Sequence, residues 1–248
     1  YNSDYMRHKE PAGDFSTALL QLGPDYYWMN QIGMTADNSS SNKAVRIDNW
    51  RPDIGPRVIN VEKETYRYLF GLRGTTDGGW DWETAVLHSK ATSEDLTENR
   101  LSNSLLQAGL NDSTSNAINI FDANVATALA PAIVDVSRND TSELSSFDFK
   151  MTNPEVINMP AGPVGMLLGF EYRAESYSDN RDPRLDGTIQ FTSAVTGLGF
   201  PFVGDVLGSS PTVDTSAKRS TNSVFAEMVL PISSKMEAQV AMRHEDPD

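Results

Sequence analysis

The sequence of 248 residues contains no cysteine, which excludes disulfides, thiolate metal sites and cysteine nucleophiles. Basic residues are few: 20 Lys and Arg stand against 34 Asp and Glu, giving a net charge of −14. Because phosphate binding needs concentrated Lys and Arg, this balance argues against a nucleic-acid partner. Apolar runs such as 164–168 fall far short of the roughly 20 residues of a membrane helix. No signal peptide is visible, and we expect the chain to be a segment of a longer protein.

Catalytic and metal-binding motifs are also lacking. His8, His88 and His244 are scattered without HxH or HExxH spacing, so no zinc site is expected, and His88 is interpreted as lying at the outer end of a strand. No GxSxG motif is present. The acidic segments 135–140 and 179–186 lack EF-hand spacing and contain arginines, which opposes Ca²⁺ binding.

Four carboxylates on predicted strands have two interpretations, either as acid/base pairs or as solvated charges that face an aqueous lumen. The second is favoured because no other catalytic residue accompanies them. They are Asp81, Glu83, Glu171 and Glu227. We therefore predict that the chain is not an enzyme and has no catalytic residue, metal or cofactor.

The clearest pattern is the two-residue alternation in segment 159–178. Val164, Met166, Leu168, Phe170 and Tyr172 form one set, and the residues between them are glycine, leucine or charged. Because successive side chains of a strand point to opposite faces, this pattern predicts a strand with one apolar and one charged face.

The same alternation recurs along the chain, in segments 65–73, 80–89, 144–151, 224–230 and 236–243. Turn residues at 76–79, 153–162 and 231–235 connect neighbouring segments closely. A further strand is possible at 45–54, although Pro52 weakens that prediction.

Longer connections separate these hairpins. We expect a loop region at 1–43 and long loops at 94–140 and 180–218, with short helices within 101–110 and 123–136. The cluster Tyr26, Tyr27 and Trp28 is interpreted either as a ligand-contacting loop or as a loop that packs on its own aromatic rings.

Short turns therefore alternate with long loops, which is typical of an outer-membrane β-barrel with short periplasmic turns and long extracellular loops. The prediction is an all-β fold of antiparallel up-and-down strands, forming an incomplete transmembrane barrel domain over 1–248. Its apolar faces would contact lipid and its charged faces would line a lumen. The expected aromatic girdle comprises Tyr66, Trp80, Trp82, Tyr172 and Tyr177.

Several motifs resemble the barrels of TonB-dependent outer-membrane receptors. They are TYRYLFGLRG at 65–74 with GGWDWE at 78–83, TSEL at 141–144 with MPAGPVG at 159–165 and GFEYR at 169–173, and SVFAE at 223–227 with LPI at 230–232, followed by 236–243. The resemblance covers about residues 45–90 and 141–246.

This resemblance implies a 22-stranded barrel of which the chain supplies about six to eight strands. It also implies a plug domain, the TonB protein of the inner membrane as energy-coupling partner, a location in the bacterial outer membrane, and a scarce nutrient as ligand, such as a siderophore, cobalamin or an oligosaccharide. One alternative is a soluble β-rich binding or adhesion module whose apolar faces form a sandwich core. Another is an outer-membrane enzyme, for which no catalytic constellation is visible.

Overall fold

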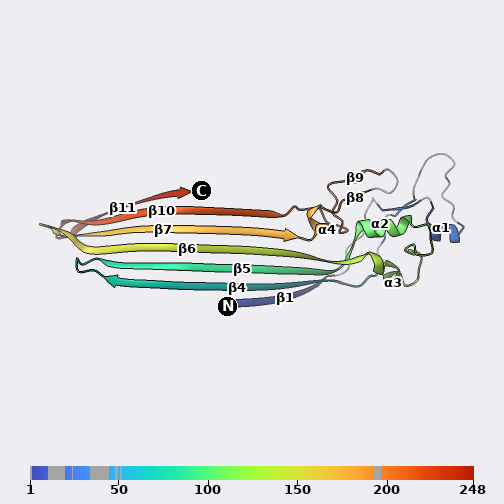
Figure 1. The fold of residues 1–248 in the computed structure, drawn as a ribbon, viewed down its shortest axis with the longest axis horizontal. Helices are drawn as coiled ribbons and strands as arrows, with labels where there is room; N and C mark the ends of the chain where they lie inside the picture. The colour runs from blue at the N-terminus through green and yellow to red at the C-terminus, as the bar shows by residue number, and fades with distance from the viewer. Residues whose placement is uncertain are drawn as a thin grey trace.

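The computed structural model describes residues 2–10, 20–23, 25–33, 45–47, 50, 52–192 and 197–248. Its main feature is one antiparallel sheet in the order β1-β4-β5-β6-β7-β10-β11 (Figure 1). Six strands form an up-and-down meander of neighbours: β4 (Arg57–Thr75), β5 (Asp81–Leu101), β6 (Ile133–Met159), β7 (Gly162–Arg181), β10 (Thr215–Ser233) and β11 (Met236–Pro247). The prediction of a mostly antiparallel β protein is confirmed.

The sheet strands are far longer than their apolar segments. Strand β6 has 27 residues where alternation predicted only 144–151, and at about 3.3 Å per residue it extends about 90 Å. The added length has a polar middle segment at 137–143 and only scattered apolar residues near its two ends, so it lacks the regular apolar period on which the prediction relied. Ladder hydrogen bonds and cross-strand pairs such as Lys90–Glu143, at 3.0 Å, hold these polar halves together.

The predicted long loops are accordingly too long at both ends. The connection between β5 and β6 covers 102–132 instead of 94–140, and that between β7 and β10 covers 182–214 instead of 180–218. The first contains α2 (Asn103–Asn111), α3 (Val125–Leu129) and the 3₁₀ turn η1 (Ala130–Ala132), so the two predicted helices are present. The second contains α4 (Pro183–Asp186), β8 (Phe191–Thr192) and β9 (Gly199–Phe200).

The N-terminal predictions need correction as well. Part of the expected loop region 1–43 forms the strand β1 (Asn2–Glu10), which pairs with the first half of β4. Residues 20–33 contain β2 (Gln21–Leu22) and α1 (Tyr27–Gln31), whereas 11–19 and 34–43 lie outside the described residues. Of the possible strand at 45–54, only β3 (Val45–Arg46) and a bridge at Trp50 are seen.

The turn predicted at 153–162 is mostly strand. β6 continues to Met159 and turns only at Pro160 and Ala161, after an irregularity between Asn153 and Ile157. There the Asn153 side chain accepts a hydrogen bond from the Glu155 backbone N–H at 2.8 Å. Pro154, which has no N–H to donate, is accommodated within this bulge.

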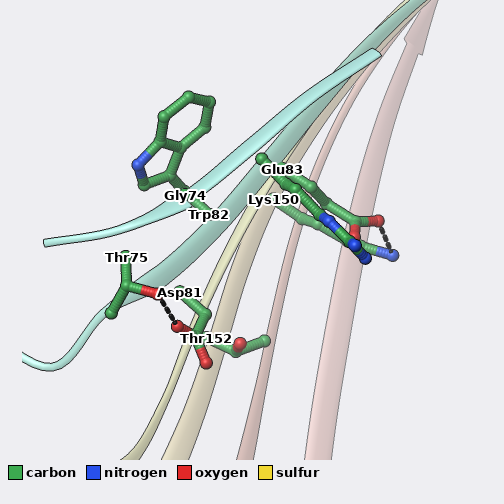
Figure 2. A pocket seen from close by; sticks show the side chains of 8 residues that line it. Gly74, Thr75, Asp81, Trp82, Glu83, Lys150 and Thr152 are labelled. Carbon is green, nitrogen blue, oxygen red and sulfur yellow. Dashed lines mark hydrogen bonds and ion pairs between the residues drawn. The ribbon is translucent and has the colours of Figure 1, made fainter.

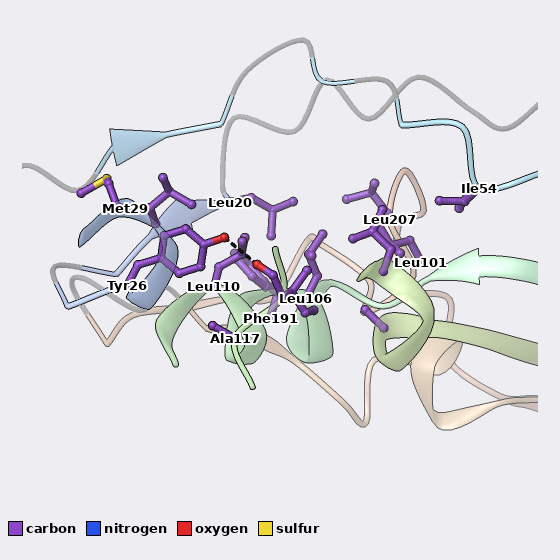
Figure 3. Close-up of a cluster of buried hydrophobic side chains, with 14 residues drawn as sticks. Leu20, Tyr26, Met29, Ile54, Leu101, Leu106, Leu110, Ala117, Phe191 and Leu207 are labelled. Carbon is purple, nitrogen blue, oxygen red and sulfur yellow. Dashed lines mark hydrogen bonds between the residues drawn. The ribbon is translucent and has the colours of Figure 1, made fainter. Parts of the chain in front are cut away.

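The buried core lies beside the sheet, at the ends of the strands opposite the hairpin turns (Figure 1). The connection 102–132 and the described parts of the connection 182–214 meet residues 20–23, 25–33 and 52–56 there, and we call this region the cap. Figure 3 shows the side chains that fill it. They include Leu101, Leu106 and Leu110, which join Tyr26 and Phe191 at exposures of 0–1%.

Candidate functional site

The two faces of the sheet differ in chemistry, and the strand register makes each face continuous. Across four strands, Phe70 is level with Val86, Phe147 and Tyr172. On β10 and β11, Val224, Ala226 and Met228 are paired with His244, Met242 and Val240. These residues belong to an apolar face that is exposed, with Phe70 at 63% and Met242 at 71%. No described element packs against it.

The opposite face, the polar face, carries a chain of ion pairs across β7, β10 and β11. Arg219 contacts Glu175, which lies 3.7 Å from Arg173. Arg173 is 3.4 Å from Glu171, and Glu171 is 2.9 Å from Arg243. Because these pairs lie at the surface, where water screens them, each contributes little to stability. Their chemical importance is that they present alternating charge to solvent or to a polar ligand.

A glycine and an aromatic ring give this part of the polar face its shape. Gly169 pairs with Phe225, and a Cβ at position 169 would lie only 2.1 Å from the ring. The Arg243 guanidinium lies 5.5 Å from the centre of the same ring. Glycine therefore allows Phe225 to lie across β7, and the ring in turn supports Arg243 by a cation–π contact.

A hollow of about 440 Å³ lies near the turn between β4 and β5 (Figure 2). Glu83 and Lys150 form an ion pair on one side, and Thr75 donates a 2.6 Å hydrogen bond to Asp81 on another. Trp82 points to the other face, where it covers Gly74. Arg73 also lines the hollow and, within the described part of the chain, has no ion-pair partner.

The four carboxylates considered as acid/base pairs are placed as separate charges on this polar face. Glu83 pairs with Lys150 and Glu171 with Arg243. Asp81 accepts from Thr75, and Glu227 accepts from Gln239. This arrangement agrees with the interpretation of solvated charges.

In the cap, one carboxylate is completely buried. The Asp205 side chain has 0% exposure and accepts hydrogen bonds from the Ser102 hydroxyl and the Ser104 backbone N–H, both at 2.8 Å. Arg184 forms an ion pair with the same carboxylate. Burial alone would raise the pKa of Asp205, but the hydrogen bonds from Ser104, Ser102 and Arg184 outweigh it and the pKa is lowered. Through these hydrogen bonds and this ion pair, Asp205 links α2 and α4 to the segment before β10. We call this group the Asp205 tie.

In the acidic segments considered for Ca²⁺, Asp140 and Asp179 are paired with arginine. Asp179 accepts two hydrogen bonds from Arg138, at 3.0 and 2.9 Å, and one from Arg181 at 2.7 Å. The hydrogen bonds from Arg138 are the main reason that the pKa of Asp179 is lowered. Among the described residues, no group of three or more His, Asp or Glu is arranged to hold a metal ion.

The aromatic cluster near the N-terminus packs into the cap. Tyr26 is fully buried and donates a 2.5 Å hydrogen bond to the Ile118 carbonyl oxygen (Figure 3). Burial raises its pKa. The indole N–H of Trp28 donates to the Ala117 carbonyl oxygen at 2.8 Å, and its ring meets Tyr27 edge-on. Tyr27 and Trp28 therefore contact each other as the second interpretation predicted, whereas Tyr26 packs among the other side chains of the cap core.

Two further sequence predictions are wrong. Tyr177 pairs with Ser142 and Ala217, so it lies on the polar face, opposite the face of Tyr172, and its hydroxyl reaches Asp140 at 3.3 Å. The other predicted girdle residues have the parity of the apolar face. His88 lies within β5, not at its outer end, because the strand continues for 13 residues beyond it, to Leu101.

No known protein family, curated protein or solved structure matches the chain. No helix in the described part is long and apolar enough to cross a membrane.

Sequence reasoning missed the Asp205 tie. Ser102 directly precedes a helical segment and accepts from the Leu105 N–H at 3.2 Å, so its role as N-cap was visible in the sequence. The pairing of Asp205 with Arg184 and Ser102 was not visible, because these residues are 21 and 103 positions apart in polar segments.

Proposed function

We propose that the chain forms part of the wall of an outer-membrane β-barrel of the TonB-dependent receptor type, which imports a scarce nutrient. The apolar face would contact lipid, while the polar face and the cap would recognise the ligand. No covalent chemistry is required. The remaining barrel strands, a plug domain and TonB are the partners that this proposal implies.

The observation that carries the proposal is a long sheet whose apolar face is uncovered and whose other face carries charge. In water, exposed apolar patches of this kind are rare and mark contact surfaces. In a bilayer, the same pattern of alternating apolar and polar residues is the expected one for a barrel strand. The placement of short turns at one end and a folded cap at the other is also typical of such barrels.

The residues that carry the resemblance to TonB-dependent receptors support the proposal in a second way. The segments 65–74 and 78–83 lie on the β4–β5 hairpin, 141–173 on the β6–β7 hairpin, and 223–243 on the β10–β11 hairpin. The soluble sandwich alternative requires a covered apolar face. The 14 clustered core residues lie in the cap instead.

Fractionation of the native source, combined with intact mass measurement, tests the proposal. We expect the protein in the outer membrane, released only by detergent, with a mass above the 27.3 kDa of this chain. A detergent-free soluble monomer of 27.3 kDa would contradict the proposal and favour the binding module.

A further inference from the structure

A second hollow, of about 510 Å³, lies beside the hollow of Figure 2 and shares Asp81 and Thr152 with it. It opens on the polar face, to which Asp81, Leu167 and Glu227 belong through their common register. Among the described residues, Asp81 and Glu227 are the two charged ones in its lining, and both are acidic. Leu167 and Val229 make the space between them largely apolar. We call this space the acidic hollow.

The irregularity of β6 creates the acidic hollow. Residues 154–156 of β6 lie opposite Gly165 of β7 alone, and a bulge of this kind bends the strand. A Cβ at Gly165 would have the Pro154 carbonyl oxygen, at 3.7 Å, as its nearest neighbour. Because Gly165 has no side chain, neither strand fills the space at this level, and backbone oxygen atoms border it.

The two carboxylates of the acidic hollow differ from other carboxylates of the polar face. Several glutamates there form ion pairs with Lys or Arg, namely Glu83, Glu171 and Glu175. Asp81 instead accepts a 2.6 Å hydrogen bond from Thr75, and Glu227 accepts one from Gln239. Among the residues that the structure describes, neither carboxylate has a basic partner. Their hydrogen bonds come from uncharged groups, so the negative charge of the hollow is not balanced within its lining.

The strand register sets the distance between the two carboxylates. Asp81 is level with Glu227, through Thr152 and Leu167. These residues stand on four neighbouring strands, and three strand spacings span about 14 Å. A single ammonium group cannot contact both carboxylates, whereas a linear molecule with a cation at each end can. The middle of such a molecule would lie over Leu167 and Val229, a surface that favours methylene groups.

We propose that the acidic hollow binds a linear aliphatic diamine, with one ammonium group at Asp81 and the other at Glu227. Each ammonium donates charge-assisted hydrogen bonds to its carboxylate, and the methylene chain packs on Leu167. With C–C bonds of about 1.5 Å, an extended chain advances about 1.25 Å per bond, so about eight carbons place the nitrogens about 11 Å apart. Two hydrogen bonds of about 2.8 Å cover the remaining distance. The basic side chains nearby, Arg73 and Lys150, line the neighbouring hollow.

Calorimetric titration of the purified protein, in a non-ionic detergent where one is needed, tests the proposal with octamethylenediamine as the probe. Putrescine is a shorter diamine, and mono-N-acetyl-octamethylenediamine has the same length but a single charge. Asp81→Asn and Glu227→Gln each remove one carboxylate charge while keeping the shape of the side chain. Glu237→Gln removes the same charge from the same face of β11, outside the hollow, and is the matched control variant.

We expect octamethylenediamine to bind at least about fivefold more tightly than either control ligand. Its advantage over the acetylated amine should disappear in Asp81→Asn and in Glu227→Gln and persist in Glu237→Gln. No binding, equal affinities of the three ligands, or an equal loss in Glu237→Gln would overturn the proposal, because the last two results mean a general attraction between cations and an acidic chain. The ligand comparison needs no variant to fold. It also does not depend on a membrane location, so the fractionation experiment tests the proposed function separately.

Discussion

The Asp205 carboxylate brings together side chains and backbone from three separate segments of the chain. Its carboxylate is desolvated, and such a group is costly unless hydrogen bonds and an opposite charge compensate. Ser102, Ser104 and Arg184 provide both. Because α2 begins at this cluster, we expect loss of the carboxylate to loosen the helix and its neighbours before the sheet is affected.

The lowered pKa of Asp205 makes this tie sensitive to acid. A folded pKa below the unfolded value of about 3.9 means that the carboxylate stabilises the fold above that value, and that the contribution is lost as pH falls through the folded pKa. We expect amide protection of Asn103–Asn111 to fall steeply below about pH 4. Hydrogen exchange measured between pH 2.5 and 7 checks this.

Asp205→Asn should reduce the protection of α2 at pH 7, because breaking one partner of a buried pair costs about 3 kcal/mol or more. It should also flatten the dependence on acid pH. Asp186→Asn in the same connection is the control, because the Asp186 carboxylate is bonded to neighbouring Thr188 near the surface. An acid transition unchanged in Asp205→Asn would contradict this role.

Gly169 provides a second test at the residue scale. A methyl group there would meet the Phe225 ring at 2.1 Å, whereas at Gly165 the nearest atom is 3.7 Å away. Overpacking of this kind costs about 1–3 kcal/mol. We expect Gly169→Ala to lower the urea midpoint of unfolding and Gly165→Ala to leave it nearly unchanged. Equal midpoints for the two variants would show that the Phe225 ring moves freely.

At the scale of the element, α2 shows how a short amphipathic helix organises the cap. Leu106 and Leu110 are completely buried, while Leu105, directly before Leu106 in the sequence, is 38% exposed. The helical period places the first two on one side of the helix and Leu105 on another. Ser102 caps the N-terminus of α2, and the buried side of the helix packs against the cap core.

Leu106→Ala should destabilise the cap by about 2–5 kcal/mol, because the cavity lies among buried side chains that relax only partly. Leu105→Ala should change stability by about 0.5 kcal/mol or less, as is typical of exposed sites. Hydrogen exchange resolved by segment measures both. We expect increased exchange in 101–118 and unchanged exchange in β6 and β7. Loss of protection throughout the sheet would show that the cap and the sheet unfold together.

The full length of the strands could not be predicted from residue periodicity alone. Their halves near the turns alternate between apolar and polar residues and were predicted within a few residues, except that β6 continues to Met159 where a turn was predicted from 153. Some segments near the cap are mostly polar, as at 94–100 of β5, and were assigned to loops. What holds them as strands is pairing with residues far away in the sequence, such as Lys90 of β5 with Glu143 of β6, which no local pattern encodes.

On the scale of the whole molecule, the apolar face and the cap core are separate surfaces. Because the two surfaces are separate, an arginine introduced on the apolar face should affect stability differently from one introduced on the polar face. Arg at Phe70 or Leu168 would place a cation at the expected bilayer midplane, at a cost of about 2–4 kcal/mol. Leu69→Arg is a matched control, because Leu69 is equally exposed, at 65%, on the polar face.

We expect Phe70→Arg and Leu168→Arg to lower the amount of folded protein in the outer-membrane fraction, and Leu69→Arg to have little effect. Urea unfolding in lipid vesicles gives the free energies. Complete loss of folding in Phe70→Arg, together with recovery of the unsubstituted protein from the soluble fraction, would instead indicate a dry protein core. A tolerated arginine at all three positions would contradict both.

The sequence by itself determined the local properties of the chain. Two-residue alternation and turn residues specified antiparallel strands with two different faces, and the helical period at 101–110 specified α2. These features depend on residues only a few positions apart, so they can be predicted without knowledge of the tertiary structure. Only the tertiary structure decided how far each strand extends, that the core lies in the cap, which face Tyr177 occupies and that Asp205 meets Ser102. Those outcomes depend on register and on contacts between distant segments, whose free energies arise only when the whole chain is assembled.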